Sequence, residues 1–409
     1  MKINLRHLRV VLAVAETGAL MRAAEACHVS QPAVTQAVAK LEKLAGQALF
    51  TRAPTGIYVT PAGEVLVARI RRAFALLDPV LADLAPRLKL TATSAQLQAL
   101  IAVRETENFT LAARRMGLAQ PTVHRAVTTL EQEAARPLFE RTLYGVIATR
   151  PAQALAQAAR LAFAELDQAQ ADLAELIGRE VGRLVIGAMP LSRSFILPRA
   201  IARFRKRRPT LPIRALDGPY EDMMAGLRRG EVDFLIGALR EPPPIGDVEQ
   251  EALFDDTLVL VARSDHPMMR TAKLGLAELA QYPFVVATEG TPTRTAFDRL
   301  FRDASVEPAS LVETGSMILM RELLRRSDHI GCISRLQVQA ELRAGAIAEL
   351  PIPLPQTTRP IGITRRSGWL ATTAQREFLD DLRTALDEDT EMWVEDTVRP
   401  ATARLRLRH

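Results

Sequence analysis

Cysteine, aromatic residues and long apolar runs are all scarce in this chain of 409 residues. The two cysteines, Cys27 and Cys332, cannot form a disulfide framework and show no metal-ligand spacing, which favours a reducing compartment. No stretch approaches the roughly 18 apolar residues of a membrane span, and the short N-terminal apolar run lacks a signal-peptide cleavage pattern. We therefore expect a cytoplasmic protein with no membrane partner.

Patterns that carry catalysis are also missing from the sequence. The six histidines show no paired spacing for a metal, and neither a phosphate loop of the GxxxxGKS type nor a nucleophile elbow occurs. We therefore expect no enzymatic activity, no metal and no cofactor.

The composition is that of a soluble globular protein with more than one domain. Hydrophobic residues make up 48% and charged residues 24% of the chain, and its length exceeds what one hydrophobic core usually supports. A net charge of +6 and a pI near 9.7 permit a nucleic-acid partner but do not require one.

The chain repeats itself after 89 residues. The stretch "AEACHVSQPAVTQAVAKLE" at 24–42 (copy 1) returns without a gap as "ARRMGLAQPTVHRAVTTLE" at 113–131 (copy 2), and the match continues from Leu8 and Leu97 to Thr60 and Thr149. Two copies are too few for a solenoid, so the pattern indicates tandem duplication of one small domain.

Each copy predicts a winged helix-turn-helix. In copy 1 an apolar-periodic helix precedes a short helix, a polar turn and a third helix that Ser30 or Gln31 can cap, and a hairpin around Gly56 follows. Small and amide side chains near the start of the third helix suit the major groove, and a wing arginine suits phosphate. The predicted DNA contacts are Ser30, Gln31, Pro32, Ala33, Thr35, Gln36, Lys40 and Arg52 in copy 1, with Gln120, Thr122, His124, Arg125 and Arg141 in copy 2.

Two alternatives stay open for these copies. A helix-turn-helix pattern also occurs in ordinary helical bundles, and copy 2 can be a dimerisation spacer that does not read DNA. Nucleoid-type DNA packaging would leave the C-terminal half unexplained.

The segments that follow the two hairpins carry apolar residues seven apart, namely Ile70, Leu77 and Leu84, then Ala159, Leu166 and Leu173. Leu155, Ala162, Ala169 and Leu176 supply the alternate seam position of the second segment. Because Pro79 and Pro86 should kink or stop the first helix, we assign the main dimer seam to the second, although both stripes can instead pack within one chain.

The C-terminal half alternates short apolar strands with amphipathic helices, which predicts an α/β domain with a largely parallel sheet. We expect strands at 183–188, 213–216, 234–237, 257–262, 284–287, 330–333 and 361–364. Ligands bind at the carboxyl ends of such strands, where helix N-termini present free N–H groups. The predicted effector site comprises Ser192, Arg193, Ser194, Thr291, Thr293, Arg294, Gly315 and Ser316.

A purely structural role for these residues also stays open. The hydroxyl residues can be simple helix caps, and the basic run "RFRKRRP" at 203–209 is better explained as a solvated helix face than as a nucleic-acid patch. We expect the ligand to be anionic, with a neutral ligand as the alternative.

The sequence resembles the LysR-type transcriptional regulators of bacteria. The resemblance is carried by "LRHLRVVLAVAETGALMRAAEACHVSQPAVTQAVAKLEKLAGQALFTR" in copy 1, and by "LPRAIARFRKRRP", "LRRGEVDFLIG", "LFDDTLVLVARSDHP" and "GWLATTAQREFLDDL" in the C-terminal half. It implies a two-lobed effector domain like that of periplasmic binding proteins, a small-molecule effector in its cleft, and homotetramers on promoter DNA. The chain departs from the family in its second winged helix, where Ala119 replaces the serine cap and Ala135 replaces the glycine found at position 46.

We therefore expect a multidomain chain with two all-α winged helix-turn-helix domains followed by a two-lobed α/β effector domain. The expected segments are 1–62 (DNA-binding), 63–90 (linker helix), 91–150 (second DNA-binding domain), 151–180 (dimerising linker helix), 181–387 (effector-binding) and 388–409 (tail). The predicted function is a ligand-controlled transcriptional regulator that binds double-stranded promoter DNA as a homodimer or homotetramer. A cytoplasmic small-molecule-binding protein, or an enzyme on the same α/β fold, is the alternative.

Overall fold

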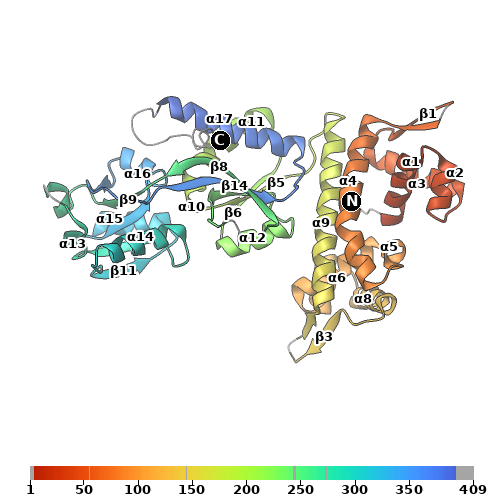
Figure 1. Ribbon diagram of the computed structural model, residues 1–409, viewed down its shortest axis with the longest axis horizontal. Coiled ribbons are helices and arrows are strands. Elements are labelled where there is room, and N and C mark those ends of the chain that lie inside the picture. The colour runs from red at the N-terminus through yellow and green to blue at the C-terminus, as the bar shows by residue number, and fades with distance from the viewer. Residues whose placement is uncertain (1–3, 55, 144, 243–245, 272–273, 393–409) are drawn as a thin grey trace, which may run out of the picture. The chain divides into compact units, whose positions relative to one another are not determined.

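The computed structural model describes residues 4–54, 56–143, 145–242, 246–271 and 274–392 (Figure 1). The chain forms two compact units, an N-terminal unit of Met1–Arg183 and a C-terminal unit that begins at Leu184. Most of the expected tail, 393–409, lies outside the described residues, whereas 388–392 continue the last helix.

The two copies fold alike in the N-terminal unit. Copy 1 comprises α1 (Leu5–Thr17), α2 (Leu20–Ala26), α3 (Gln31–Ala45), β1 (Phe50–Ala53) and β2 (Gly56–Val59). Copy 2 comprises α6 (Ser94–Thr106), α7 (Phe109–Met116), α8 (Gln120–Ala134), β3 (Phe139–Thr142) and β4 (Gly145–Ala148). Each hairpin pairs antiparallel, with Arg52 opposite Ile57 and Arg141 opposite Val146. The expected winged helix-turn-helix is confirmed in both copies.

The ends of the third helix differ between the copies. The Ser30 hydroxyl caps α3 by accepting a hydrogen bond from the Ala33 N–H at 3.4 Å, whereas Ala119 leaves α8 without a side-chain cap. At the C-terminal end, Gly46 takes a left-handed conformation with φ 71°, and Ala135 takes the same conformation with φ 51°. Copy 2 therefore repeats the backbone of copy 1 without the two residues that favour it.

Two long helices join the copies, α4 (Pro61–Leu84) and α9 (Arg150–Glu175), with the short α5 (Leu88–Thr91) between them in sequence. Both heptad stripes except Leu176, which is exposed, are buried in one hydrophobic core, in which α4 packs on α9 of the same chain. Within the chain, the structure thus has the alternative arrangement, in which both helices pack on each other, and a seam between chains through α9 stays a prediction. The physical reason is tethering, because the matching stripe on α4 is always present at high effective concentration.

Of the two effects expected of Pro79, a kink or a stop, the stop does not occur. The helix continues to Leu84, and Pro86 follows its end. Leu81 and Leu84 beyond the proline are buried against the shared core. Burial of two leucines, worth about 1.5 to 3 kcal/mol each, offsets the roughly 3 kcal/mol that an internal proline costs a helix.

The C-terminal unit contains two five-stranded sheets. The first has the order β6 (Ile213–Leu216), β5 (Leu184–Ala188), β7 (Phe234–Ala238), β14 (Arg359–Arg366) and β8 (Val248–Asp256). The second has the order β11 (Ser310–Glu313), β10 (Pro283–Val286), β12 (Ile330–Ser334), β9 (Leu258–Ala262) and β13 (Ala348–Glu349). The two-lobed fold is confirmed, but the sheets are mixed rather than largely parallel, because β14 and β9 each pair antiparallel with both neighbours.

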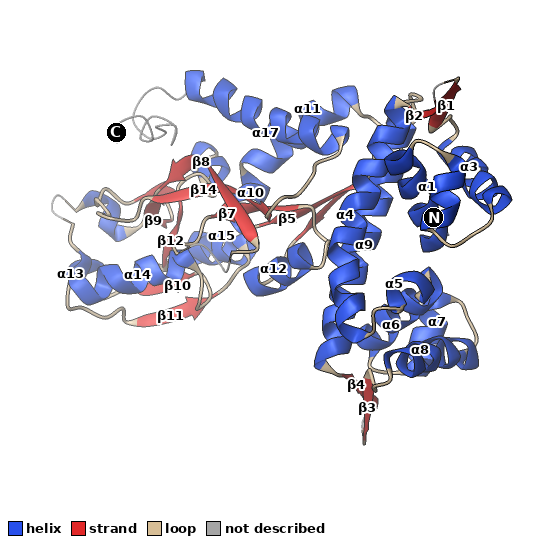
Figure 2. Cartoon of the chain, turned by 45° about the vertical axis from the view of Figure 1, so that its right-hand side comes forward, coloured by secondary structure: helices blue, strands red, loops and turns tan. Residues whose placement is uncertain are grey.

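Helices cover both faces of each sheet. They are α10 (Pro190–Ser194), α11 (Ile196–Arg207), α12 (Tyr220–Arg228), the 3-10 turn η1 (Pro267–Arg270), α13 (Leu276–Leu279), α14 (Pro292–Asp303), α15 (Met317–Arg326), α16 (Gln339–Arg343) and α17 (Thr373–Met392). Helices α11 and α17 lie side by side over the first sheet (Figure 2), where Phe204 and Phe378 pack edge to face. The basic run on α11 faces α17, since Arg208 pairs with Glu377 and Arg207 with Asp381.

Candidate DNA-reading faces and effector cavity

The recognition face of copy 1 is exposed as the sequence predicts. Ser30, Gln31, Pro32, Ala33, Thr35, Gln36 and Lys40 are all exposed, while Val34, Ala37 and Leu41 on the opposite face of α3 are buried. Arg52 is exposed on β1. Burial, followed by the charges of Lys40 and Arg6, lowers the pKa of His7. The arrangement suits contact with a polyanion.

The corresponding face of copy 2 is exposed at Gln120, Thr122, Arg125 and Arg141. His124 differs, because it is half-buried, its ring lies 5.1 Å from that of Phe109, and it shares a hydrogen bond with Thr128. The structure therefore places the His124 side chain between α7 and α8, and its contact with DNA stays a prediction.

Copy 2 also carries exposed basic residues that the helix-turn-helix pattern does not predict. Arg114 and Arg115 are exposed on α7, where copy 1 has Glu25 and Ala26 at the equivalent positions. A residue-by-residue comparison of the repeat reveals this gain of positive charge. Arg115 Nη1 lies 2.5 Å from Glu105 Oε2.

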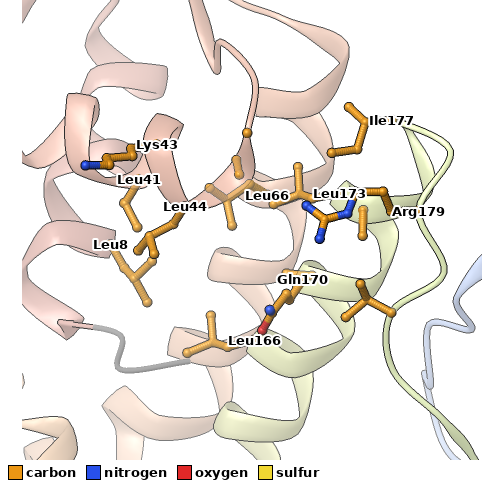
Figure 3. Close-up of a pocket in the computed structure, with 15 residues that line it drawn as sticks. Leu8, Leu41, Lys43, Leu44, Leu66, Leu166, Gln170, Leu173, Ile177 and Arg179 are labelled. Atoms are coloured by element: carbon orange, nitrogen blue, oxygen red, sulfur yellow. The ribbon is translucent and has the colours of Figure 1, made fainter.

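A small pocket of about 170 Å³ lies where copy 1 meets α9 (Figure 3). Its walls are mainly leucines of α1, α3, α4 and α9, among them Leu8, Leu41, Leu66, Leu166 and Leu173. Lys43, Gln170 and Arg179 are the polar side chains labelled around it. The pocket is a packing gap in the apolar seam between the copies.

A larger cavity of about 540 Å³ lies in the C-terminal unit where strands of both sheets end. Its walls include Met189 after β5, Asp217 after β6, Arg240 after β7 and Thr288 after β10, together with Ile333 of β12. This is the position that the α/β pattern predicts for a ligand.

The structure places five of the eight predicted effector residues on this cavity and three away from it. Arg193, Thr291, Thr293, Gly315 and Ser316 line the cavity. The other three are held elsewhere: Ser192 is buried and donates to the Met189 carbonyl, Ser194 donates to the Leu191 carbonyl, and Arg294 pairs with Asp298 and Glu313. These three residues do not belong to the cavity wall. Their hydroxyl and guanidinium groups bond to other protein groups instead of pointing at the cavity.

Arg359 lines the cavity, and no sequence pattern points to it. It starts an antiparallel strand, and its Nη2 lies 3.1 Å from Asp256 Oδ2 while its Nη1 donates to Thr293 Oγ1 at 2.5 Å. Asp256 also accepts from Ser334 Oγ at 2.9 Å, and burial raises the pKa of this carboxyl. The guanidinium is therefore fixed at the wall.

The remaining cavity charges are balanced. Arg193 pairs with Asp217 at 2.6 Å, and Arg240 lies 4.2 Å above the ring of Tyr220. With Glu221 and Glu289, the walls carry three arginines and three carboxylates. Tyr220 and Arg240 follow predicted strands. The rule that ligands bind at the carboxyl ends of strands, which located Thr291, therefore points to them too.

Helix N-termini add fixed partial positive charge to the walls. Helices α12, α14 and α15 begin beside the cavity, and the Thr291 and Ser316 hydroxyls cap α14 and α15 by accepting from the Arg294 and Leu319 N–H groups. Among the described residues, no group of three or more His, Cys, Asp or Glu side chains has an arrangement that could hold a metal ion. No described helix is long and apolar enough to cross a membrane.

Comparisons with known proteins agree with this geometry. The family described as "Bacterial regulatory helix-turn-helix protein, lysR family" matches twice, at 5–64 and 94–153, which is again an offset of 89 residues. The family described as "LysR substrate binding domain" matches 178–387.

Individual proteins match over most of the chain. The HTH-type transcriptional regulator GalR of Pseudomonas putida is 35% identical over 394 residues, covering 94% of this chain and 98% of GalR. Solved structures of LysG from Corynebacterium glutamicum with bound effector Arg and of CbnR with its target DNA are each 22% identical, with TM-scores of 0.52 and 0.50. They cover 72% and 71% of this chain and 98% and 99% of their own, and they support the fold. The chain therefore belongs to the LysR family of transcriptional regulators, with a duplicated helix-turn-helix region for DNA and a C-terminal effector-binding domain.

Proposed function

We propose that both winged helices of this cytoplasmic regulator contact promoter DNA and that a small anionic effector binds the 540 Å³ cavity. The single observation that carries the DNA part is the exposed polar face of α3 beside an exposed wing arginine, an arrangement repeated by α8 and β3. Base edges are read by side chains in the major groove, and arginines outside it bind phosphate.

The test is a footprint on the promoter region beside the gene for this protein, followed by binding assays with variants. Gln36→Ala should weaken binding by about 1 to 3 kcal/mol at one base position, whereas Arg52→Ala should weaken binding to every sequence. Arg302→Ala is the matched control, since Arg302 is exposed on α14 in the C-terminal unit. Unchanged affinity and selectivity in both test variants would contradict the proposed contacts.

The anionic character of the effector rests on the helix N-termini, because the formal charges of the walls cancel. The N-termini of α14 and α15 offer partial positive charge to a carboxylate or phosphate. Met189, Met320 and Ile333 provide an apolar wall for the rest of the molecule.

Thermal unfolding of the full chain, followed by tryptophan fluorescence, tests the effector. Carboxylates or phosphates should raise the midpoint more than neutral sugars at equal concentration. Preference for a neutral sugar would refute the charge argument while leaving the cavity as the binding site.

The buried state of Cys332 argues against an enzyme that uses a thiol nucleophile. This cysteine lines the cavity, but burial raises the pKa of its thiol to about 12, so the nucleophilic thiolate is absent near neutral pH. We therefore propose a binding role without catalysis.

A further inference from the structure

The two copies pair with each other through reciprocal contacts inside one chain. Gln47 Nε2 donates to the Leu173 carbonyl at 3.0 Å, and Arg136 Nη2 donates to the Leu84 carbonyl at 3.4 Å. Gln47 and Arg136 are 89 residues apart, and so are Leu84 and Leu173. Each copy thus holds the end of the other copy's long helix at the same place, which is the signature of a two-fold contact.

The shared core has the same reciprocal pattern. It includes the equivalent pairs Leu8 and Leu97, Leu41 and Leu130, Leu49 and Leu138, Leu66 and Leu155, and Leu77 and Leu166. Figures 1 and 2 show the two hairpins at opposite ends of the α4–α9 pair, so the helices run antiparallel. Copy 1 and copy 2 are therefore related by an approximate two-fold axis through this helix pair.

Charges break the symmetry of the seam. Arg69 on α4, with a side chain only 1% exposed, binds Glu165 Oε2 at 2.9 Å and Asp172 Oδ2 at 2.8 Å on α9. Arg72 adds two bonds to Glu165, of 3.0 and 2.9 Å. Burial raises the pKa of Glu165, but the hydrogen bonds and the positive charges of Arg72 and Arg69 together bring it below its usual value.

The asymmetric charges specify which copies pair. The positions equivalent to Arg69 and Arg72 in copy 2 are Ala158 and Leu161, and the position equivalent to Glu165 in copy 1 is Leu76. Two α9 helices paired in the same way would bury Glu165 against Ala158 and Leu161 without a cation. Burying an unpaired charge is costly, so the seam favours copy 1 with copy 2 over like with like.

The reading faces of the paired copies differ in chemistry. Gln36 of α3 is replaced by Arg125 on α8, and Lys40 by Thr129, while the wing arginines Arg52 and Arg141 are the same. In the major groove glutamine suits adenine, and arginine suits guanine. The phosphate contacts are thus alike, and the base contacts are not.

We propose that a single chain forms a complete pair of DNA readers and recognises two non-identical half-sites in inverted orientation, one through α3 and one through α8. The proposal rests on the proposed function, in which both faces contact DNA. It adds that the pairing is intramolecular and that the operator is asymmetric.

Half-site substitution on the full chain tests the asymmetry. Gln36→Ala should relax an adenine preference in one half of the footprint, and Arg125→Ala a guanine preference in the other, each with a loss of about 5- to 150-fold at the contacted base. Palindromes built from either half-site twice should bind more weakly than the natural operator. Equal binding of a palindrome, or action of both variants in the same half, would overturn the proposal. No effect of either variant on any DNA would instead show that the proposed contacts themselves are wrong.

Subunit mixing tests the intramolecular pairing. One chain carries Gln36→Ala with Arg52→Ala, which disables copy 1, and the other carries Arg125→Ala with Arg141→Ala, which disables copy 2. If the copies pair within a chain, co-expression yields no intact pair, and affinity stays at the level of the separate variants. Recovery of operator binding in the co-expressed sample would mean that copy 1 pairs with copy 2 of another chain, and the proposal would fail.

Discussion

Replacing Arg69 by methionine should destabilise the N-terminal unit while leaving the C-terminal unit unchanged. Methionine keeps the apolar stem but leaves Glu165 and Asp172, whose side chains are 7% and 15% exposed, without this guanidinium. Removing one partner of a buried pair costs roughly 3 to 5 kcal/mol. We expect about 3 kcal/mol, because Arg72 still binds Glu165 and the partly exposed Asp172 can regain water.

Urea unfolding separates the two units. Both tryptophans, Trp369 and Trp393, lie beyond Leu184 in sequence, so tryptophan fluorescence follows the C-terminal unit and far-ultraviolet circular dichroism follows helices in both. With a slope of about 2 kcal/mol per molar urea, the loss corresponds to a midpoint shift of roughly 1.5 M in the dichroism transition of the N-terminal unit. The fluorescence transition should not move.

Arg71→Met is the matched control on the same helix. Arg71 is exposed and lies 3.8 Å from Glu16, so its replacement should change stability by less than about 0.5 kcal/mol. Equal effects of the two substitutions, or a shift in the fluorescence transition for Arg69→Met, would refute the reasoning. Because the folded pKa of Glu165 is lowered, its contribution is fully present above pH 4.5 and is lost as the pH falls through the folded value, so Glu165→Gln should flatten this acid dependence.

Three further predictions concern the copy 2 helix end, the copy 2 phosphate contacts and the buried thiol. Ala135→Gly should raise the stability of the N-terminal unit by about 0.5 to 1 kcal/mol in urea unfolding, because glycine adopts the left-handed conformation without the penalty of a Cβ; a loss of stability would contradict this explanation. Changing Arg125 and Arg141 together to alanine should reduce the salt slope of DNA binding by roughly one to two units per chain and shorten the footprint, and an unaltered slope and footprint would mean that only copy 1 reads DNA. Cys332, 1% exposed and with a pKa near 12, should resist alkylation at pH 8 until the chain unfolds, whereas rapid labelling of the native protein would show that the cavity wall opens.

The duplicated winged helix could be predicted from the sequence because its signals are local. The 89-residue offset aligns caps, wings and apolar stripes without any knowledge of which elements meet in space. What the stripes pack against is a long-range property, so the sequence does not decide whether α9 packs within one chain or between chains. Whether Pro79 stops its helix is undecided by the sequence for a related reason, since the helix beyond it depends on burial of Leu81 and Leu84 in a core shared with copy 2.

The effector site was predictable only in part. The strand-end rule located Thr291, Thr293, Gly315 and Ser316 correctly on the cavity wall, because helix starts after strands are visible as local patterns. The rule could not reveal that the Ser192 hydroxyl donates a hydrogen bond to the Met189 carbonyl instead of facing the cavity. The edge strands β8 and β11 also escaped detection, since they are largely half-buried or exposed and mix charged with apolar residues instead of forming a continuous apolar run.

The antiparallel α4–α9 pair has a consequence for the ratio of winged helices to effector cavities. The described residues of each chain form two winged helices and one C-terminal domain with the proposed effector cavity. If both winged helices read DNA as proposed, an assembly with four readers needs two chains and contains two such cavities rather than four. Within each pair the spacing of the readers is fixed by one continuous core and the Arg69 ion pairs. Under the proposed pairing, an effector would act on how one chain's pair of readers is placed relative to the pair of the next chain, and one occupied cavity would govern two half-sites.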